Sequence, residues 1–219
     1  MRYLFLTLSL FAALLTVAQK KYKPTIVVLD PYQTDYDTIL LKEIQKAAYH
    51  VDFSPDEEKH ILDSLNKNEP NIRIMDVAEF HYRKQMDFGS EFTMSLYGML
   101  TYMVFGQTEN CIVIPSHDKA NGSTEHLKTI AKKYDVQWVV NPVLFQSYTK
   151  DGEKFSKARI QVYSHQKNKI ALDKEYTGDS KNPGFELSCE SGSLDCTINN
   201  IIDPSLHDIL LTILKSYQH

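Results

Sequence analysis

Residues 123–178 read STEHLKTIAKKYDVQWVVNPVLFQSYTKDGEKFSKARIQVYSHQKNKIALDKEYTG, and this stretch decides the fold. Its first part predicts a helix, because apolar residues recur at the spacing of one helical face, at Leu127, Ile130 and Ala131. Ser123 is a favourable N-cap, since its hydroxyl can accept a hydrogen bond from the first turn. We expect three antiparallel strands to follow this helix.

The first of these strands, residues 138–148, begins with the apolar run WVVNPVLF, which is typical of a strand buried on both faces. Pro142 has no backbone N–H to donate to a neighbouring strand, so it predicts a bulge or an unpaired edge. The sequence KDGE at residues 150–153 predicts a hairpin turn, because Asp-Gly readily adopts the positive φ of tight hairpins.

The second strand shows alternation with a period of two, which predicts one buried and one wet face. Its apolar positions are Ala158, Ile160 and Val162. Its opposite positions, our candidate binding residues, are Lys157, Arg159, Gln161 and Tyr163. If no helix covers that face, these four form a platform for a partner, and if a helix does, they are ordinary sheet residues.

The third strand is expected after the polar turn at residues 165–169. One face carries the apolar residues Ile170, Leu172 and Tyr176, and the other carries Asp173 and Glu175. Lys174 falls on the apolar face, which suggests that this face leaves the core there.

The amino-terminal residues 1–18 have the pattern of a signal peptide. Arg2 is a short basic region, residues 4–15 are apolar, and Thr16-Val17-Ala18 offers small residues for cleavage after Ala18. The alternative, a membrane anchor, usually needs about 20 apolar residues. We therefore expect a periplasmic or secreted protein with no membrane span after cleavage, whose residues 19–219 form a single α/β domain.

The net charge and the cysteines limit the kinds of partner and the compartment that fit this protein. The chain has 219 residues and a net charge of −4, which argues against nucleic acid as a partner. Cys189 and Cys196 bracket the short polar loop ESGSLD and are predicted to form a disulfide, as an exported chain permits. Cys111 opens an apolar run and is expected to be a buried thiol.

The remaining segments complete an α/β fold: a mixed sheet that ends in the antiparallel meander, packed by helices. A strand is expected at 25–29 and another at 111–115, with an apolar core helix at 92–105. Residues 35–91 are expected to be a helical insertion, with helices starting near Asp37 and Ser54 and a short strand at 72–75. Residues 178–203 are expected to be loop-rich, before a last helix at 204–217.

The order of these segments resembles the amino-terminal domain of TolB and the related periplasmic modules of the CsgG, FlgO and LpoB type. The matching residues are TIVVLDPY, FTMSLYGMLTYMVF, NCIVIPSH, LKTIAKKYDVQWVVNPVLF, ARIQVYSHQ and KIALDKEYTG, within residues 25–34 and 92–178. Asn141 stands where the family usually has glycine, and residues 35–91 would be an insertion. The resemblance implies a non-catalytic module that binds other envelope proteins or builds assemblies.

The chain shows no nucleophile motif and no phosphate-binding glycine loop. We therefore predict an exported binding or scaffold module of the bacterial cell envelope, with an envelope protein as partner, no catalytic residues, no metal and no cofactor. The alternative is a hydrolase that uses the loop at 115–126, where His117, Asp118 and His126 could gather. A third hypothesis is a homo-oligomer formed through the helix at 92–105.

Overall fold

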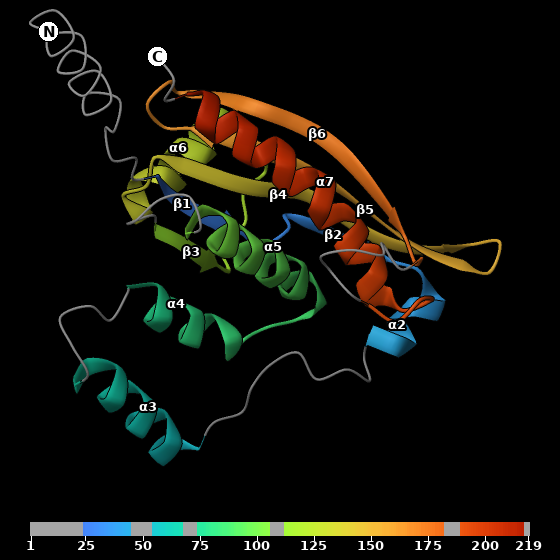
Figure 1. The fold of residues 1–219 in the computed structure, drawn as a ribbon, viewed down its shortest axis with the longest axis horizontal. Helices are drawn as coiled ribbons and strands as arrows, with labels where there is room; N and C mark the ends of the chain where they lie inside the picture. The colour runs from blue at the N-terminus through green and yellow to red at the C-terminus, as the bar shows by residue number, and fades with distance from the viewer. Residues whose placement is uncertain (1–23, 45–53, 68–73, 106–111, 182–188, 217–219) are drawn as a thin grey trace, which may run out of the picture.

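The computed structural model describes residues 24–44, 54–67, 74–105, 112–181 and 189–216. They form a mixed six-stranded sheet with helices on both faces, as the sequence predicts (Figure 1). The predicted signal peptide at 1–18 and Cys111 lie outside the described residues. Within the described ranges, no helix is long and apolar enough to cross a membrane.

The sheet has the order β3-β1-β4-β5-β6. The parallel part joins β1 (Thr25–Leu29) to β3 (Ile112–Ser116) and to the start of β4 (Trp138–Lys150). The antiparallel meander continues from β4 to β5 (Glu153–Ser164) and β6 (Lys169–Asp179). A further strand, β2 (Gln33–Tyr36), pairs in parallel with the outer part of β4.

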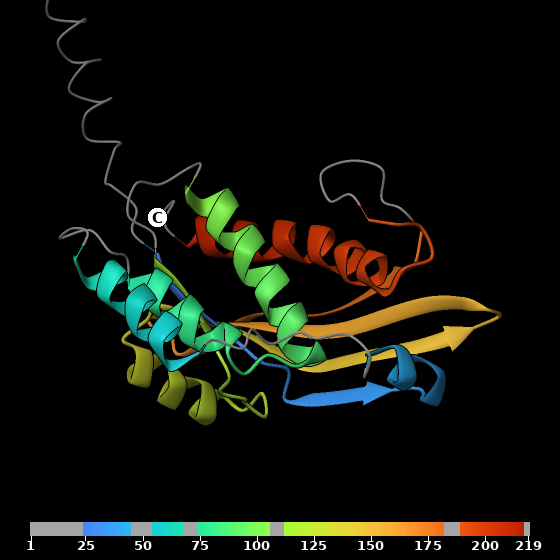
Figure 2. The ribbon, with the colours of Figure 1, turned by 90° about the horizontal axis from the view of Figure 1, so that it is seen from below.

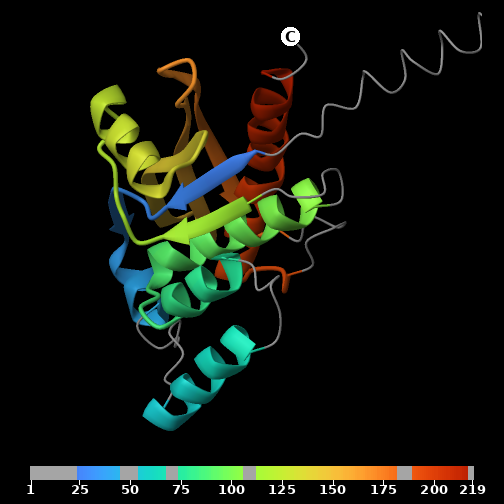
Figure 3. The same ribbon diagram turned by 90° about the vertical axis from the view of Figure 1, so that its left-hand side faces the viewer.

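Two helices cover most of one face of the sheet: α5 (Phe88–Phe105) and α7 (Leu194–Lys215). The larger hydrophobic core lies beneath them and also receives side chains from α2 (Thr38–Ile44) and from α4 (Ile74–Arg83). α3 (Pro55–Lys67) contacts α4 (Figure 3). On the opposite face, α6 (Thr124–Tyr134) encloses a smaller core. Figure 2 shows that α6 lies under one end of the sheet only.

Local chemistry explains where these elements begin and end. The Ser123 side chain caps α6 by accepting from the backbone N–H of His126, and Asp135 ends the helix in the left-handed conformation. The predicted hairpin turn has positive φ at Asp151 and Gly152. The predicted bulge in β4 lies between Pro142 and Leu144.

The carboxyl-terminal helix differs from the prediction, because α7 begins at Leu194 and not near Pro204. Ser193 caps it, and Pro204 lies inside it on the exposed side. An interior proline costs about 3 kcal/mol. The helix tolerates this cost because its other side buries apolar residues at about 1.5–3 kcal/mol each, including Ile198, Ile201 and Ile202.

Three further expectations need correction. The sequence does not predict β2, because QTDY lacks the apolar alternation of a strand. Residues 74 and 75 lie in α4 and not in a short strand. Ile170 packs in the smaller core, whereas Leu172 and Tyr176 face the larger one. The register shift between β5 and β6 near Tyr163 moves Ile170 to the opposite face.

Candidate functional site

The four candidate residues of β5 share one face, but the structure divides them into a covered pair and an accessible pair. Tyr163 is fully buried in the α6 core, and its hydroxyl donates to Asn168 Oδ1 at 2.8 Å. Gln161 is also buried, and a Cβ at Gly122 would lie only 2.9 Å from its Oε1. The loop that enters α6 therefore closes over Gln161, and neither residue can meet a partner directly.

Arg159 and Lys157 lie beyond α6, where their side chains reach solvent. The Arg159 guanidinium donates from Nε and Nη2 to the two carboxylate oxygens of Asp173, both at 2.8 Å. This contact holds the pKa of Asp173 below its usual range. Lys157 Nζ lies 2.8 Å from Glu175. Both ion pairs join β5 to β6, so they give the exposed surface alternating charge with little contribution to stability.

Apolar side chains accompany these ion pairs on the same face. Leu144 pairs with Arg159 across β4 and β5, and Tyr148 pairs with Phe155. The Tyr148 and Phe155 rings stack with centroids 5.7 Å apart and an interplanar angle of 16°. All three apolar residues are only half-buried. On the neighbouring strand, Gln146 Nε2 donates to Asp35 of β2 at 3.2 Å.

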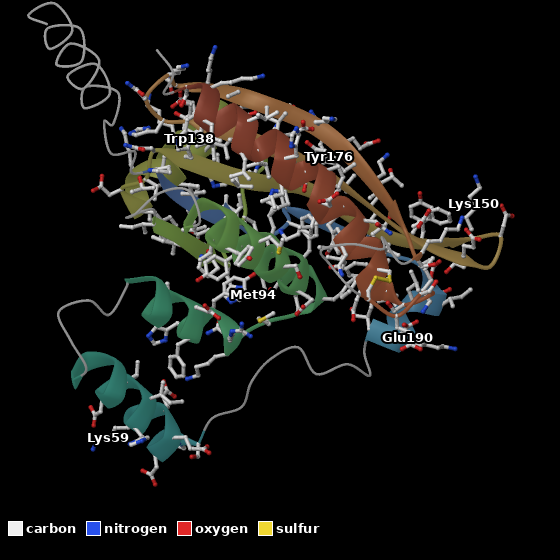
Figure 4. All side chains as sticks on the ribbon, viewed as in Figure 1. Lys59, Met94, Trp138, Lys150, Tyr176 and Glu190 are labelled. Carbon is white, nitrogen blue, oxygen red and sulfur yellow. A yellow bond between two sulfur atoms is a disulfide. The ribbon has the colours of Figure 1, made fainter. Side chains whose placement is uncertain are left out.

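We call this part of the sheet the open face. It comprises the face of β4, β5 and β6 beyond α6: Leu144, Gln146, Tyr148, Phe155, Lys157, Arg159, Asp173 and Glu175. In the part of the chain that the structure describes, no helix lies on it (Figure 2). Figure 4 shows Lys150 at the far tip of the β4–β5 hairpin. Leu144, Tyr148 and Phe155 were not singled out from the sequence, although the alternation of β5 and the hairpin register place them there.

The loop at 115–126 does not bring its three candidate residues together. His117 Nδ1 lies 2.8 Å from Asp30 Oδ2, at the end of β1. Asp118 instead pairs with Lys133 of α6 at 2.5 Å. His126 lies in the first turn of α6, where its backbone N–H donates to the Ser123 hydroxyl. Each residue thus has a separate structural contact.

His117 belongs to a buried polar network that the sequence did not reveal. Its centre is the Asp30 carboxylate, which is 4% exposed at the end of β1. The Tyr82 hydroxyl of α4 donates to Oδ1 of Asp30, and the Ser90 hydroxyl of α5 donates to Oδ2 at 3.1 Å. The Tyr82 and His117 rings stack 4.0 Å apart. The network therefore joins β1, α4, α5 and the loop after β3.

Both ring nitrogens of His117 face acceptors, since Nε2 lies 3.0 Å from the backbone oxygen of Tyr82. An imidazole can donate from both nitrogens only when it is protonated. Burial lowers the pKa of His117, but the contacts with Asp30 and the Tyr82 carbonyl outweigh burial, and the pKa is raised overall. Burial and the Asp30 charge together raise the pKa of Tyr82 far above its usual value.

This network differs from a Ser-His-Asp catalytic triad in one decisive respect. In a triad the histidine contacts the serine hydroxyl and takes its proton. Here the acceptors of the Ser90 hydroxyl are the carboxylates of Asp30 and Asp87, each 3.1 Å away, and both nitrogens of His117 have other partners. The arrangement stabilises the junction of four segments. Among the described residues, no group of three or more histidine, cysteine or acidic side chains could hold a metal ion.

The structure joins Cys189 and Cys196 in a disulfide, the pair that the sequence predicts. The bridge ties the segment before α7 to the first turn of that helix. Disulfides form and persist in oxidising compartments. The bridge lies at the start of α7, apart from the open face.

Comparison with known proteins adds few constraints. No family model matches the sequence, and no curated protein matches it. Solved structures that align with it include a hypothetical protein of Chlamydia trachomatis, at 10% identity and TM-score 0.36, over 87% of this chain and 96% of that one. The LpoB carboxyl-terminal domain of Salmonella enterica aligns at 8% identity and TM-score 0.24, over 73% of this chain and 85% of that chain. A hemagglutinin homolog of Helicobacter pylori aligns at 10% identity and TM-score 0.32, over 90% of this chain and 84% of that chain. Similarities of this size carry no inference about function.

Proposed function

We propose that the protein is an exported, non-catalytic binding module of the bacterial cell envelope, and that another envelope protein docks on the open face. The observation that carries the proposal is the combination of apolar side chains and ion pairs on the open face. Half-buried Leu144, Tyr148 and Phe155 lie beside two ion pairs on a sheet surface without a described covering helix. Aromatic and arginine side chains are enriched at the centres of protein interfaces, where they contribute most of the binding energy.

Two features support the location. Residues 1–18 have the pattern of a signal peptide, and the Cys189–Cys196 disulfide fits an oxidising compartment. The open face is also suited to a protein partner by its charges. Because Arg159 and Lys157 are already paired with carboxylates of β6, the surface carries both signs and does not favour a polyanion such as nucleic acid.

The test is affinity capture from envelope extract of the native host with a tagged protein expressed from the full-length chain. The open-face variant is Arg159→Glu combined with Phe155→Lys. The matched control, Lys132→Glu, reverses a charge at an exposed position of α6. We expect the wild type and the control to retain one specific partner, and the open-face variant to bind it at least ~30-fold more weakly, the loss of a hot spot of about 2 kcal/mol.

Two results would refute the proposal. One is capture of the same proteins by all three forms, which would place the interface elsewhere. The other is turnover of an ester, peptide or glycan by the purified protein that is lost on changing His117 or Asp118, which would support the hydrolase alternative. Circular dichroism of each form checks that the variants are folded.

A further inference from the structure

A groove with a volume of about 280 Å³ lies between α4 and α5, on the opposite side of the sheet from the open face. Figure 4 labels Met94 on the side of α5 that faces α4. The walls of the groove combine two carboxylates, one guanidinium and two thioethers, contributed by Glu79, Glu91, Arg83, Met86 and Met94. The groove takes no part in the contacts described above for the open face or for the Asp30 network.

One face of α5 forms the floor of this groove. Glu91, Met94 and Gly98 are spaced three and four residues apart, so their side-chain positions follow one another along a single stripe. At Gly98 a Cβ would meet no atom within 4 Å, so the stripe borders open space at this position. Methionine side chains are flexible and polarisable, and they adapt to ligands of different shape.

The two carboxylates of the groove differ in their surroundings. Glu79 is paired with Arg83 at 2.8 Å and accepts a hydrogen bond from the Tyr97 hydroxyl at 3.1 Å. No described residue forms a hydrogen bond or an ion pair with the Glu91 side chain. The charges that act on Glu91 are Asp195 of α7 and Arg83 of α4. The groove thus contains one carboxylate whose charge is not balanced by a direct contact.

Partial burial has a consequence for this carboxylate. Burial, and next the negative charge of Asp195, raise the pKa of Glu91, and the positive charge of Arg83 lowers it by less. A cation placed beside Glu91 would stabilise the ionised carboxylate and offset the effect of burial on its charge. The raised pKa therefore agrees with the geometry, in which a charged group lines an accessible groove without a partner.

We infer that this groove binds a small organic cation, with an ammonium group beside Glu91 and a short aliphatic chain against Met86 and Met94. The inference rests on the unpaired carboxylate, on the thioether walls and on the open space at Gly98. It is independent of the function proposed for the open face. The groove and the open face lie on opposite sides of the sheet, so a negative result for one proposal leaves the other proposal untouched.

The test is a titration of the purified protein with n-pentylammonium chloride, followed by two-dimensional NMR, with 1-pentanol as the neutral analogue. We expect saturable shifts confined to α4 and α5, and binding of the alcohol at least ~10-fold weaker, because the neutral alcohol cannot form a charge-assisted hydrogen bond with the Glu91 carboxylate that matches the one from an ammonium group. Affinity for the cation should fall as the pH is lowered through the raised pKa of Glu91, because the protonated carboxyl carries no charge.

Variants assign the effect to the groove. Glu91→Gln should weaken binding of the cation ~10-fold and remove its pH dependence, whereas Glu125→Gln, an exposed carboxylate of α6, should leave both unchanged. Gly98→Leu adds a side chain at a position where a Cβ would meet no atom within 4 Å, so the variant should fold and should bind both ligands more weakly. The inference is overturned if pentylammonium gives no saturable shift, or if Glu91→Gln binds it as tightly as the wild type.

Discussion

Replacement of His117 by Asn should reduce the stability of the protein in a pH-dependent way. The asparagine amide can still donate to Asp30, but it carries no charge and does not titrate. His117 gains Asp30 and the Tyr82 carbonyl as partners on folding, and its folded-state pKa is raised. The stability that depends on protonated His117 is therefore fully present below its unfolded pKa of about 6.5, and it is lost as the pH rises through the folded pKa.

The magnitude follows from the geometry. A hydrogen bond to a charged group contributes about 1.5–3 kcal/mol. Because the His117 side chain is 31% exposed, water screens part of this interaction. We expect His117→Asn to lower the free energy of unfolding by about 1–2 kcal/mol near pH 5.5, and by progressively less as the pH rises through the raised folded-state pKa of His117.

Urea unfolding at a series of pH values measures this difference, because subtracting the two curves removes the titration of groups that both proteins share. A double-mutant cycle with Asp30→Asn assigns the effect to the contact, and the pH-dependent difference should disappear in the Asp30→Asn background. A wild-type advantage that stays constant or grows from pH 5.5 to pH 9 would refute the reasoning. It would mean that the stability contributed by His117 does not depend on its titration over this pH range.

Two other predictions concern the attachment of α7, and the first uses a glycine of α5 for comparison. Gly178→Ala should lower the free energy of unfolding by about 1–3 kcal/mol, because its Cβ would collide with the backbone oxygen of Thr197. Gly98→Ala should raise the free energy of unfolding by about 0.5–1 kcal/mol, because its Cβ would meet no atom within 4 Å. Equal effects of Gly178→Ala and Gly98→Ala in urea unfolding would contradict the close packing of Gly178 against α7. Replacing Cys189 and Cys196 by Ser should cost about 2–3 kcal/mol for so short a loop. Reductant should destabilise the wild type but not this variant in thermal unfolding, and a wild type insensitive to reductant would argue against the bridge.

The elements that the sequence predicts best are those specified by neighbouring residues. α6 and the β4–β5 hairpin each combine a cap or turn residue with clear periodicity, as at Ser123 and Gly152. β2 has no such signal, since four mainly exposed residues pair with β4 through their backbone. The sequence predicts a start for α7 that is too late, because Pro204 resembles a helix start and the residues before it resemble a loop.

The candidate sites show the same limit. Alternation placed Lys157, Arg159, Gln161 and Tyr163 on one face of β5, but periodicity cannot show where a covering helix ends. The structure shows that α6 and its entry loop bury the second pair and leave the first accessible. The Asp30 network combines residues up to 87 positions apart, so only the position of Asp30 after a strand could have suggested it.

The most direct test of the proposed function is photo-crosslinking in the native host from position 148. Tyr148 is a half-buried aromatic residue of the open face, so p-benzoylphenylalanine can replace it with little disturbance. The same residue at Lys132, exposed on α6, is the control. The proposal predicts one defined adduct with an envelope protein from position 148 and none from position 132. A folded protein that gives no adduct from position 148, or the same adducts from both positions, would contradict it.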